Sequence, residues 1–452
     1  MFERPRGGAR AVLVRLGINA PVEQEDLDEF AQLAQSAGAQ PVVTLTGRRD
    51  RPDPRLFVGS GKAEEIRLAV EEHEADVVLF DHALSPGQER NLEKLICRRV
   101  LDRNSLILDI FAQRARSHEG KLEVELAQLR HIASRLVRGW THLERQRGGG
   151  IGLRGPGETQ LETDRRLLGE RVRVLTRRLS KLKQQRETGR QRRVEIPIPS
   201  VALVGYTNAG KSTLFSALTG ADAYVADQLF ATLDPLVRRV QLPGGSPIVV
   251  ADTVGFIREL PHELVAAFQS TLTEAREASL LLHVIDASDP RREEHIDQVN
   301  EVLEQVGAGA LPQVRVYNKI DRLEVEPHSF RDGEGRIAQV WISAAQRGGM
   351  DLLLSAIAER LDCHAREARI LLPAASGALR ARLFAAGVVR SERSRDDGAL
   401  ELTVSVPESE LRVLARAPGV QILQVADGSR AGTSEACAPP ESYLQSRSQM
   451  RA

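Results

Sequence analysis

Residues 201–218 constrain the fold of this chain more than any other stretch. A short apolar strand, 201–204, runs into the loop GYTNAGKS at 205–212, and residues 213–218 have a helical pattern. This is GxxxxGK[ST] in the strand, loop and helix context that a phosphate-binding loop requires. The glycines let backbone N–H groups turn inward around a β-phosphate, and the start of the helix adds its positive end. The stretch predicts an α/β nucleotide-binding domain with a mostly parallel sheet flanked by helices.

A second pattern concerns the base. Residues 314–317 indicate a strand that delivers the NKxD pattern at 318–321. The carboxylate of Asp321 can accept hydrogen bonds from the guanine N1–H and the exocyclic amine, and adenine has no matching pair of donors. Residues 343–345, which follow another apolar run, are placed to cover the guanine O6 with a backbone N–H. We therefore expect a guanine nucleotide.

Between these patterns lie two segments that fit nucleotide-dependent switches. Asp252 follows the apolar run 248–251 and is expected to hold Mg²⁺ through water, while the N–H of Gly255 is expected to sense a γ-phosphate. Thr232 is the hydroxyl that we expect to close over Mg²⁺ only when a γ-phosphate is present. The sequence thus predicts a site whose shape depends on the bound nucleotide.

The candidate residues can now be collected. GTP is the expected substrate and Mg²⁺ the expected cofactor, with Ser212, Thr232 and Asp252 as metal ligands and Lys211, Thr232 and Gly255 as catalytic residues. The candidate nucleotide-binding residues are Gly205, Tyr206, Thr207, Asn208, Ala209, Gly210, Lys211, Ser212, Thr213, Phe230, Ala231, Thr232, Leu233, Asp234, Asp252, Thr253, Val254, Gly255, Asn318, Lys319, Ile320, Asp321, Ser343, Ala344 and Ala345.

Phe256 departs from a common pattern. Many regulatory GTPases place a glutamine directly after the glycine equivalent to Gly255, where it orients the attacking water. A phenyl ring can neither donate nor accept that hydrogen bond. We therefore expect slow hydrolysis until a partner orders the switches, and the sequence leaves open which group orients the water.

The rest of the 452 residues divides into several parts. β-rich runs alternate with helical patterns at 11–16, 23–37, 40–45, 63–73, 77–80, 86–97 and 105–111, which predicts a small parallel α/β domain over 1–112. We expect a helical hairpin at 113–195 with a glycine-rich tip at 147–157, then the P-loop domain at 196–366. A small α+β domain at 367–426 and a disordered tail at 427–452 complete the prediction.

Residues 58–62, VGSGK, look like a fragment of a second phosphate loop, with a strand-to-helix turn as the alternative. Whether the first domain holds a second nucleotide stays open.

Charge is balanced over the whole chain, with 62 basic and 62 acidic residues, but not within it. In 113–195, Lys and Arg outnumber Asp and Glu about twofold, so the hairpin is a basic arm. A solvated coiled-coil face would explain the charge run by itself. The tip, rich in glycine and arginine, instead favours close approach to a phosphate-rich surface such as RNA.

Three scattered cysteines indicate neither a disulfide framework nor a zinc site. Apolar runs are too short for a membrane helix, which takes roughly 18 residues. We expect a cytoplasmic protein without integral membrane contact.

Three stretches carry a family resemblance: GGGIGLRGPGETQLETDRR at 148–166, LILDIFA at 106–112 and EGKLEVELAQL at 119–129. Together with the nucleotide-site patterns, they resemble the HflX family within the translation-factor-related class of GTPases. The resemblance covers residues 1 to about 425. It implies a monomeric GTPase of the large (50S) ribosomal subunit whose hairpin tip contacts ribosomal RNA, not DNA. It also implies a role in splitting or rescuing stalled ribosomes or in subunit maturation. A hydrophobic residue at position 256 is expected in that family.

Two other functions compete with this one. A signalling GTPase with protein effectors would need no glycine-rich tip. An RNA-binding module with a vestigial nucleotide site is disfavoured because the site is complete.

Overall fold

A computed structural model describes this protein over most of its length. The described residues are 8–138, 156–191, 198–220, 229–230, 232–243, 247–258, 269–361, 365–373, 376–385, 388–395, 398–407, 411, 414–415, 417 and 419–425. The chain forms two compact units, Met1–Leu361 and Asp362–Ala452, and each is considered by itself. The predicted tail 427–452 and all but the last two residues of the predicted tip 147–157 lie outside the described residues.

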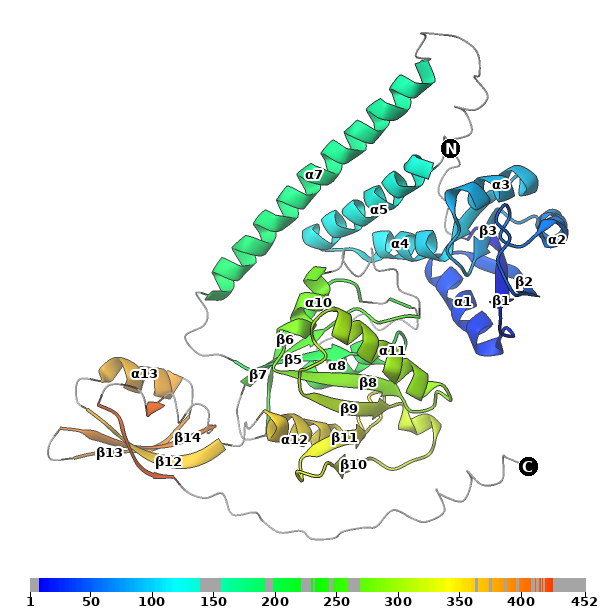
Figure 1. The fold of residues 1–452 in the computed structure, drawn as a ribbon. Helices are drawn as coiled ribbons and strands as arrows, with labels where there is room; N and C mark the ends of the chain where they lie inside the picture. The colour runs from blue at the N-terminus through cyan, green and yellow to red at the C-terminus, as the bar shows by residue number, and fades with distance from the viewer. Residues whose placement is uncertain are drawn as a thin grey trace. The chain divides into compact units, whose positions relative to one another are not determined.

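The first unit begins with a four-stranded parallel sheet in the order β2-β1-β3-β4. Figure 1 draws this part of the chain, from β1 to α4, in blue to cyan. Its strands are β1 Arg10–Ile18, β2 Gln40–Arg49, β3 Val77–Phe80 and β4 Arg99–Asp102, and its helices are α1 Gln24–Ser36, α2 Ser60–Glu72, α3 Pro86–Ile96 and α4 Arg103–Arg114. Successive side chains of β1 lie on opposite faces of the sheet and so belong to two different cores. Leu13 packs in the core with α1 and α4, and Val12 and Val14 pack in the core with α2 and α3. The predicted parallel α/β arrangement is therefore confirmed.

The last run of the predicted alternation, 105–111, would be a strand, but it lies inside helix α4. The strand at this point is the short β4, and Asp102 at its end accepts a hydrogen bond from the backbone N–H of Ser105 at 2.9 Å. That carboxylate caps the helix start. A short apolar run cannot by itself distinguish a buried strand from a buried helix, which is why the alternation misled.

Residues 58–62 form the turn into α2. Gly59 precedes the helix with a φ of 81°, a conformation that favours glycine. The ammonium of Lys62 binds Glu65 at 2.7 Å. In this structure the segment is a helix-starting turn, the alternative left open from the sequence.

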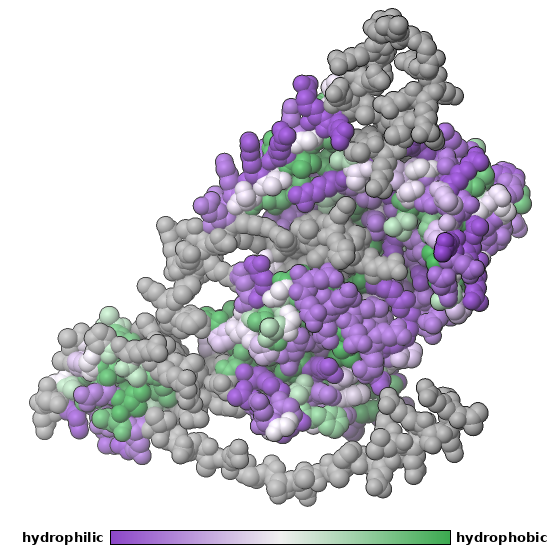
Figure 2. Space-filling view, in the orientation of Figure 1, coloured by the Kyte–Doolittle hydropathy of each residue, from purple (hydrophilic) through white to green (hydrophobic). Residues whose placement is uncertain are grey.

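The basic arm consists of α5 His118–Arg138 and α7 Pro156–Gln191. Leu122 and Leu126 of α5 pack against Leu175 and Leu179 of α7. Arg171 adds an ion pair to Glu125 at 2.6 Å. Figure 2 shows hydrophilic side chains along α7 and hydrophobic ones where it meets α5. The leucines at three- and four-residue steps thus form a helix-to-helix seam, as predicted.

A seven-stranded sheet in the order β10-β11-β9-β8-β5-β7-β6 follows. Its strands are β5 Ser200–Val204, β6 Leu236–Gln241, β7 Pro247–Asp252, β8 Leu280–Asp286, β9 Gln313–Asn318, β10 His328–Arg331 and β11 Ile337–Trp341, with helices α8 Lys211–Thr219, α10 Gln269–Arg276, α11 Arg292–Gln305 and α12 Met350–Arg360 and the 3₁₀ turn Ile320–Arg322. The five inner strands are parallel, and the edge strands β6 and β10 are antiparallel to their neighbours. The carboxyl ends of β5, β7, β8 and β9 therefore meet at one edge of the sheet, where ligands bind in such folds.

The second unit holds an antiparallel sheet in the order β13-β14-β12-β15, together with helix α13. These elements are β12 Ala365–Leu372, α13 Gly377–Ala385, β13 Val389–Ser394, β14 Leu400–Pro407 and β15 Gln421–Val425. Ile370, Leu402 and Leu383 lie in its own core. This is the predicted small α+β fold. Within the described part of the whole chain, no helix has both the length and the apolar composition needed to cross a bilayer.

Candidate nucleotide-binding site

The loop between β5 and α8 is held by two glycines that no other residue could replace. Gly205 has a φ of 150°, and a Cβ there would lie 2.2 Å from the carbonyl oxygen of Val284. Gly210 has a φ of 91°, and a Cβ there would lie 2.3 Å from Nδ2 of Asn318. A Cβ atom does not make nonbonded contacts this short, so both positions require glycine for backbone angle and for space. The loop is fixed against β8 and β9 by these close approaches.

Lys211 begins α8 and is buried beneath the loop. Its ammonium donates to the carbonyl oxygens of Gly205 at 3.0 Å and Tyr206 at 2.7 Å. Burial lowers the pKa of Lys211 to about 8, a shift opposed by the charge of Asp252 and reinforced by that of Lys319. A buried ammonium in this position gains from an anion brought close to it, which is what a phosphate group supplies.

Three oxygen-bearing side chains converge next to this lysine. Oγ of Ser212 and Oγ1 of Thr232 each lie 2.9 Å from Oδ2 of Asp252 and 2.8 Å from each other. The second carboxylate oxygen of Asp252 is buried without a hydrogen-bond partner, and burial raises the pKa of Asp252. Among the described residues no cluster of three or more His, Cys, Asp or Glu side chains is placed to hold a metal. This all-oxygen set of two hydroxyls and one carboxylate nevertheless fits Mg²⁺, which prefers oxygen and few protein ligands.

The segment after β7 is joined to the phosphate loop by backbone hydrogen bonds. The N–H of Thr207 donates to the carbonyl of Phe256 at 2.7 Å, and the N–H of Phe256 donates to the carbonyl of Gly205 at 3.1 Å. A Cβ at Gly255 would lie 2.9 Å from Nζ of Lys211, so only glycine allows this approach. The side chain of Phe256 is 3% exposed and belongs to the core. The ring of Phe256 therefore packs the segment 252–256 into the core and offers no polar group to a water molecule.

A side chain of the base-reading segment is hydrogen-bonded to the phosphate loop. Asn318 donates from Nδ2 to the carbonyl of Ala209 at 2.9 Å and accepts at Oδ1 from the N–H of Ala344 at 2.9 Å. Oγ of Ser343 donates to Oδ1 of Asp321 at 2.5 Å. These bonds hold the ends of β9 and β11 together, although Asn318 and Ala344 are 26 residues apart in the sequence. Asp321 is thus oriented by the hydroxyl of Ser343.

Lys319 links the same two loops. It lies in the left-handed region, with a φ of 64°. Its ammonium donates to the carbonyl of Asn208 at 2.6 Å and pairs with Asp286 at 2.8 Å.

Several candidates have other roles in this structure. The carboxylate of Asp234 accepts hydrogen bonds from the backbone N–H groups of Arg116 and Ser117 and from the hydroxyl of Ser117. A contact of Asp234 with nucleotide stays a prediction. The side chains of Phe230, Leu233, Val254 and Ile320 are buried in hydrophobic cores. Thr253 donates its hydroxyl to the carbonyl of Leu203 at 2.6 Å, Ala345 is exposed, and Ala231 lies outside the described residues.

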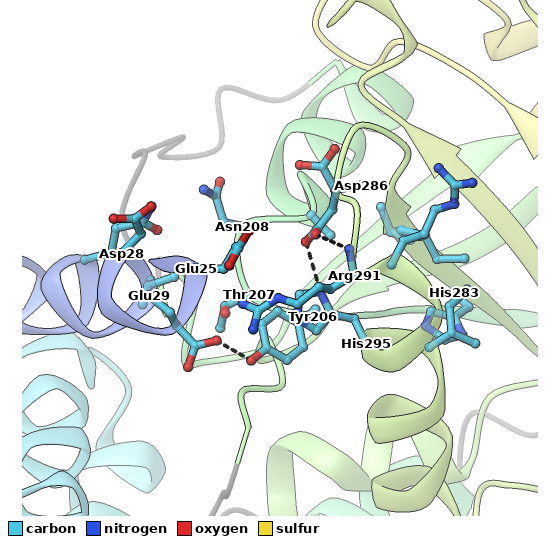
Figure 3. Close-up of a pocket in the computed structure, with 18 residues that line it drawn as sticks. Glu25, Asp28, Glu29, Tyr206, Thr207, Asn208, His283, Asp286, Arg291 and His295 are labelled. Atoms are coloured by element: carbon cyan, nitrogen blue, oxygen red, sulfur yellow. Dashed lines mark hydrogen bonds and ion pairs between the residues drawn. The ribbon is translucent and has the colours of Figure 1, made fainter. Parts of the chain in front are cut away.

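Reasoning from the sequence missed that α1 of the first domain reaches the phosphate loop. The hydroxyl of Tyr206 donates to Glu29 at 2.5 Å and accepts from the N–H of Arg258 at 2.9 Å (Figure 3). Burial, followed by the charge of Glu29, raises the pKa of Tyr206 and keeps the phenol protonated. Arg103 also binds Glu29, at 2.8 Å, and donates to the carbonyl of Arg258 at 3.1 Å. The acidic run in α1 was the only signal, and it resembles any solvated helix face.

A second set of ion pairs strengthens this connection. Asp26 of α1 accepts from Arg258 at 2.7 Å and from Arg291 at 2.8 Å, and it also pairs with Arg15 at 2.7 Å. Burial alone would raise the pKa of Asp26, but the hydrogen bond to Arg291 and the three positive charges lower it. The residue is therefore held as a carboxylate between the two domains.

A cavity of about 210 Å³ lies where these elements meet. Figure 3 shows Glu25, Asp28 and Glu29 on one side and Asn208 and Asp286 on the other. Its lining includes Tyr206 to Ala209 but not Lys211, Ser212 or Asp252. The cavity is therefore beside the phosphate site and is formed by the contact between the first domain and the loop.

With this geometry in place, the chain can be compared with known proteins. Four family models match it in order: "GTP-binding GTPase N-terminal" at 24–112, "GTP-binding GTPase Middle Region" at 114–193, "50S ribosome-binding GTPase" at 200–319 and "HflX C-terminal domain" at 328–427. GTPase HflX of Escherichia coli (strain K12) is 55% identical over 417 residues, which cover 92% of this chain and 98% of that protein. The chain belongs to the HflX family.

A second HflX protein agrees with this assignment. GTPase HflX of Caldanaerobacter subterraneus subsp. tengcongensis is 49% identical over 361 residues, covering 80% of this chain and 82% of that protein. Among solved structures, a GTP-binding protein from Sulfolobus solfataricus in complex with GDP is similar, with 23% identity and a TM-score of 0.43 over 78% of this chain and 98% of that one. As a member of the HflX family, this chain is a GTPase that binds GTP as substrate and hydrolyses it to GDP and phosphate.

Proposed function

We propose that this GTPase binds the large ribosomal subunit and acts there in splitting or rescuing stalled ribosomes or in subunit maturation. The observation that carries the proposal is the match of residues 200–319 to the 50S ribosome-binding GTPase model. In this proposal the protein is a cytoplasmic monomer. Its parts are the α/β domain 1–112, the arm 113–195, the GTPase domain 196–366, the α+β domain 367–426 and the tail 427–452.

The arm is the part that we assign to ribosomal RNA. The side chains of Arg173, Arg177 and Arg178 on α7 are exposed, so their charges are available to phosphates. Phosphate contacts supply much of the affinity of proteins for nucleic acid. The glycine-rich stretch 147–157, which joins α5 to α7 in the sequence, would let backbone come close to such a surface. The seam of leucines gives the arm a fixed geometry at its base.

At the nucleotide site we assign roles by position. Lys211 neutralises charge on the β- and γ-phosphates, and the N–H groups of the loop 205–212 surround the β-phosphate. Ser212, Thr232 and Asp252 would hold Mg²⁺, which when bound offsets the charge that develops on the phosphates. Asp321 and the backbone of Ala344 recognise the guanine.

The burial of Phe256 affects the expected rate of GTP hydrolysis. Because its side chain is buried in the core, no side chain at this position can orient a water molecule for attack on the γ-phosphate. We infer that turnover is slow in the isolated chain and rises when the large subunit orders the switches and supplies the missing geometry.

Co-sedimentation with purified large subunits, in a GTP analogue and over a series of salt concentrations, tests this function. Binding through phosphate contacts should weaken steeply as salt rises. A double variant with Arg173→Glu and Arg177→Glu on α7 should bind less and show a shallower salt dependence. The matched control is Arg390→Glu with Arg393→Glu, the same change of charge at exposed positions of β13.

Turnover is measured in parallel on the same samples. We expect GTP hydrolysis by the wild type to rise with large subunits and much less with the α7 variant. A wild type that fails to sediment, or that hydrolyses GTP at tens per second alone, would contradict the proposal. Salt-insensitive capture of a protein partner would favour a signalling GTPase instead.

A further inference from the structure

The first helix of the arm starts on a serine cap. The hydroxyl of Ser117 accepts a hydrogen bond from the N–H of Gly120 at 2.9 Å, and its carbonyl accepts the first helical bond from Lys121 at 3.1 Å. Serine is a preferred residue at this position because it satisfies an N–H that has no partner inside the helix. The cap is therefore ordinary in its local chemistry.

The unusual feature is a carboxylate from another part of the chain that completes this cap. Asp234 lies 117 residues later and accepts at Oδ2 from the N–H of Ser117 at 2.7 Å and from the N–H of Arg116 at 2.8 Å. Its Oδ1 accepts from the hydroxyl of Ser117 at 2.5 Å. An anion at a helix start is stabilised by the free N–H groups and the helix dipole. Asp234 is thus held by three donors.

Gly120 makes room for this contact. A Cβ at that position would lie 2.3 Å from Oδ1 of Asp234 and 3.0 Å from Oγ of Ser117. Glycine in a helix costs about 0.5–1 kcal/mol relative to alanine, so its presence here needs a reason. The close approach of Asp234 supplies that reason.

Asp234 belongs to the same predicted switch as Thr232, the segment 230–234. Asp234 is two residues from Thr232, whose hydroxyl lies 2.9 Å from Asp252 and 2.8 Å from Ser212. Two residues span at most about 7 Å, so the carboxylate cannot be displaced far without moving Thr232. Leu233, between them, is 2% exposed in the core that also contains Ala115, the residue that caps the end of α4 just before the arm begins.

A second contact fixes the other side of the same segment. The ring of Phe230 lies edge-on to that of Phe111 of α4, with centroids 4.7 Å apart. Thr232 is therefore flanked by two anchored residues. Phe230 contacts α4, and Asp234 contacts the start of α5. The hydroxyl's position at the candidate magnesium site depends on elements outside the GTPase domain.

We propose that the turn at Ser117–Gly120 positions Thr232 through Asp234 and so couples the arm to the nucleotide state. In this proposal Ser117 and Asp234 are positioning residues, since they act on the site through Thr232. This inference rests on the proposed role of Thr232 in closing over Mg²⁺ with a γ-phosphate. Coupling of this kind is reciprocal: whatever holds the arm changes the affinity for GTP, and GTP changes the preferred state of the arm.

Nucleotide affinities of the isolated full-length chain test the inference without the ribosome. Fluorescent GDP and a fluorescent non-hydrolysable GTP analogue are titrated over a range of Mg²⁺ concentrations. Asp234→Ala and Ser117→Ala should each lower the affinity for the analogue by about tenfold at limiting Mg²⁺, the order expected for losing charged hydrogen bonds. The affinity for GDP should stay within about twofold, because Thr232 contributes only when the γ-phosphate is present.

Matched controls separate positioning from a general loss of stability. Asp53 accepts from two backbone N–H groups, at 2.8 Å each, and Ser85 caps α3 through the N–H of Gln88. Asp53→Ala and Ser85→Ala should therefore cost stability but leave the ratio of analogue to GDP affinity unchanged. Ser117→Thr, which keeps the hydroxyl, should restore that ratio toward the wild-type value.

Two outcomes would overturn the inference: wild-type ratios in both Asp234→Ala and Ser117→Ala, or an equal loss for GDP and the analogue. Gly120→Ala gives an independent check, because it displaces Asp234 without removing a polar group. It should lower the ratio in the same direction. A wild-type chain that binds the analogue equally with and without Mg²⁺ would instead refute the proposed magnesium site and leave the contact with the arm untouched.

Discussion

Exchange of one atom at Asp321 should change which base the site accepts. Asp321→Asn keeps an oxygen for the hydroxyl of Ser343, which lies 2.5 Å from Oδ1, so the side chain should stay in place. Its new amide would face the N1–H and amino donors of guanine, whereas xanthine presents a carbonyl oxygen there. We therefore expect the variant to lose GTP and gain xanthosine triphosphate.

The structure sets the size of the effect. Two hydrogen bonds to a charged carboxylate contribute about 1.5–3 kcal/mol each. Asp321 is half-buried, so the lower end applies and the sum is about 3 kcal/mol. At about 1.4 kcal/mol per factor of ten, affinity for GTP should fall about 100-fold.

Competition binding with a fluorescent guanine nucleotide measures both affinities on one sample. Ser343→Ala is the matched control: it removes the orienting hydroxyl but leaves the carboxylate. It should weaken GTP by about tenfold or less, as one hydrogen bond would, without any gain for xanthine. If Asp321→Asn retained its preference for GTP, the assignment of the base site would be wrong.

Three further variants test other parts of the structure. Lys211→Ala should abolish GTP binding with an unchanged far-ultraviolet circular dichroism spectrum, and unaltered affinity would count against the phosphate loop. Tyr206→Phe leaves the partly buried N–H of Arg258 without its acceptor and Glu29 without one donor, so denaturant unfolding should show a loss of about 2 kcal/mol. A loss under about 0.5 kcal/mol, typical of an exposed site, would show that this contact is not formed. Burial lowers the pKa of His283 from 6.5 to about 4, so the stability that comes from keeping it neutral is complete above pH 6.5 and is lost as pH falls toward 4. Between pH 7 and 5 the wild type should therefore lose about 2 kcal/mol more unfolding free energy than His283→Gln, and parallel curves would contradict the buried neutral histidine.

Contiguous patterns in the sequence were sufficient for much of the fold and for the expected composition of the nucleotide site. Loop 205–212 and residues 318–321 each lie at the end of a parallel strand, and such ends meet at one edge of a sheet. The leucine periodicity of the arm likewise predicted its helix pair correctly. The alternation rule failed at 105–111, where a capping carboxylate at Asp102 rather than the apolar run decides between strand and helix.

Contacts between distant segments were decided only by the tertiary structure. Glu29 and Tyr206 are 177 residues apart, and Ser117 and Asp234 are 117 apart. Nothing local marks either pair, since an acidic helix face and an aspartate after a leucine occur in many solvated surfaces. Their meeting depends on how whole elements pack, and packing is set by the shapes of many side chains at once rather than by spacing along the chain. The sequence therefore determined what chemistry the chain carries, and the packing determined which outlying segments are attached to it.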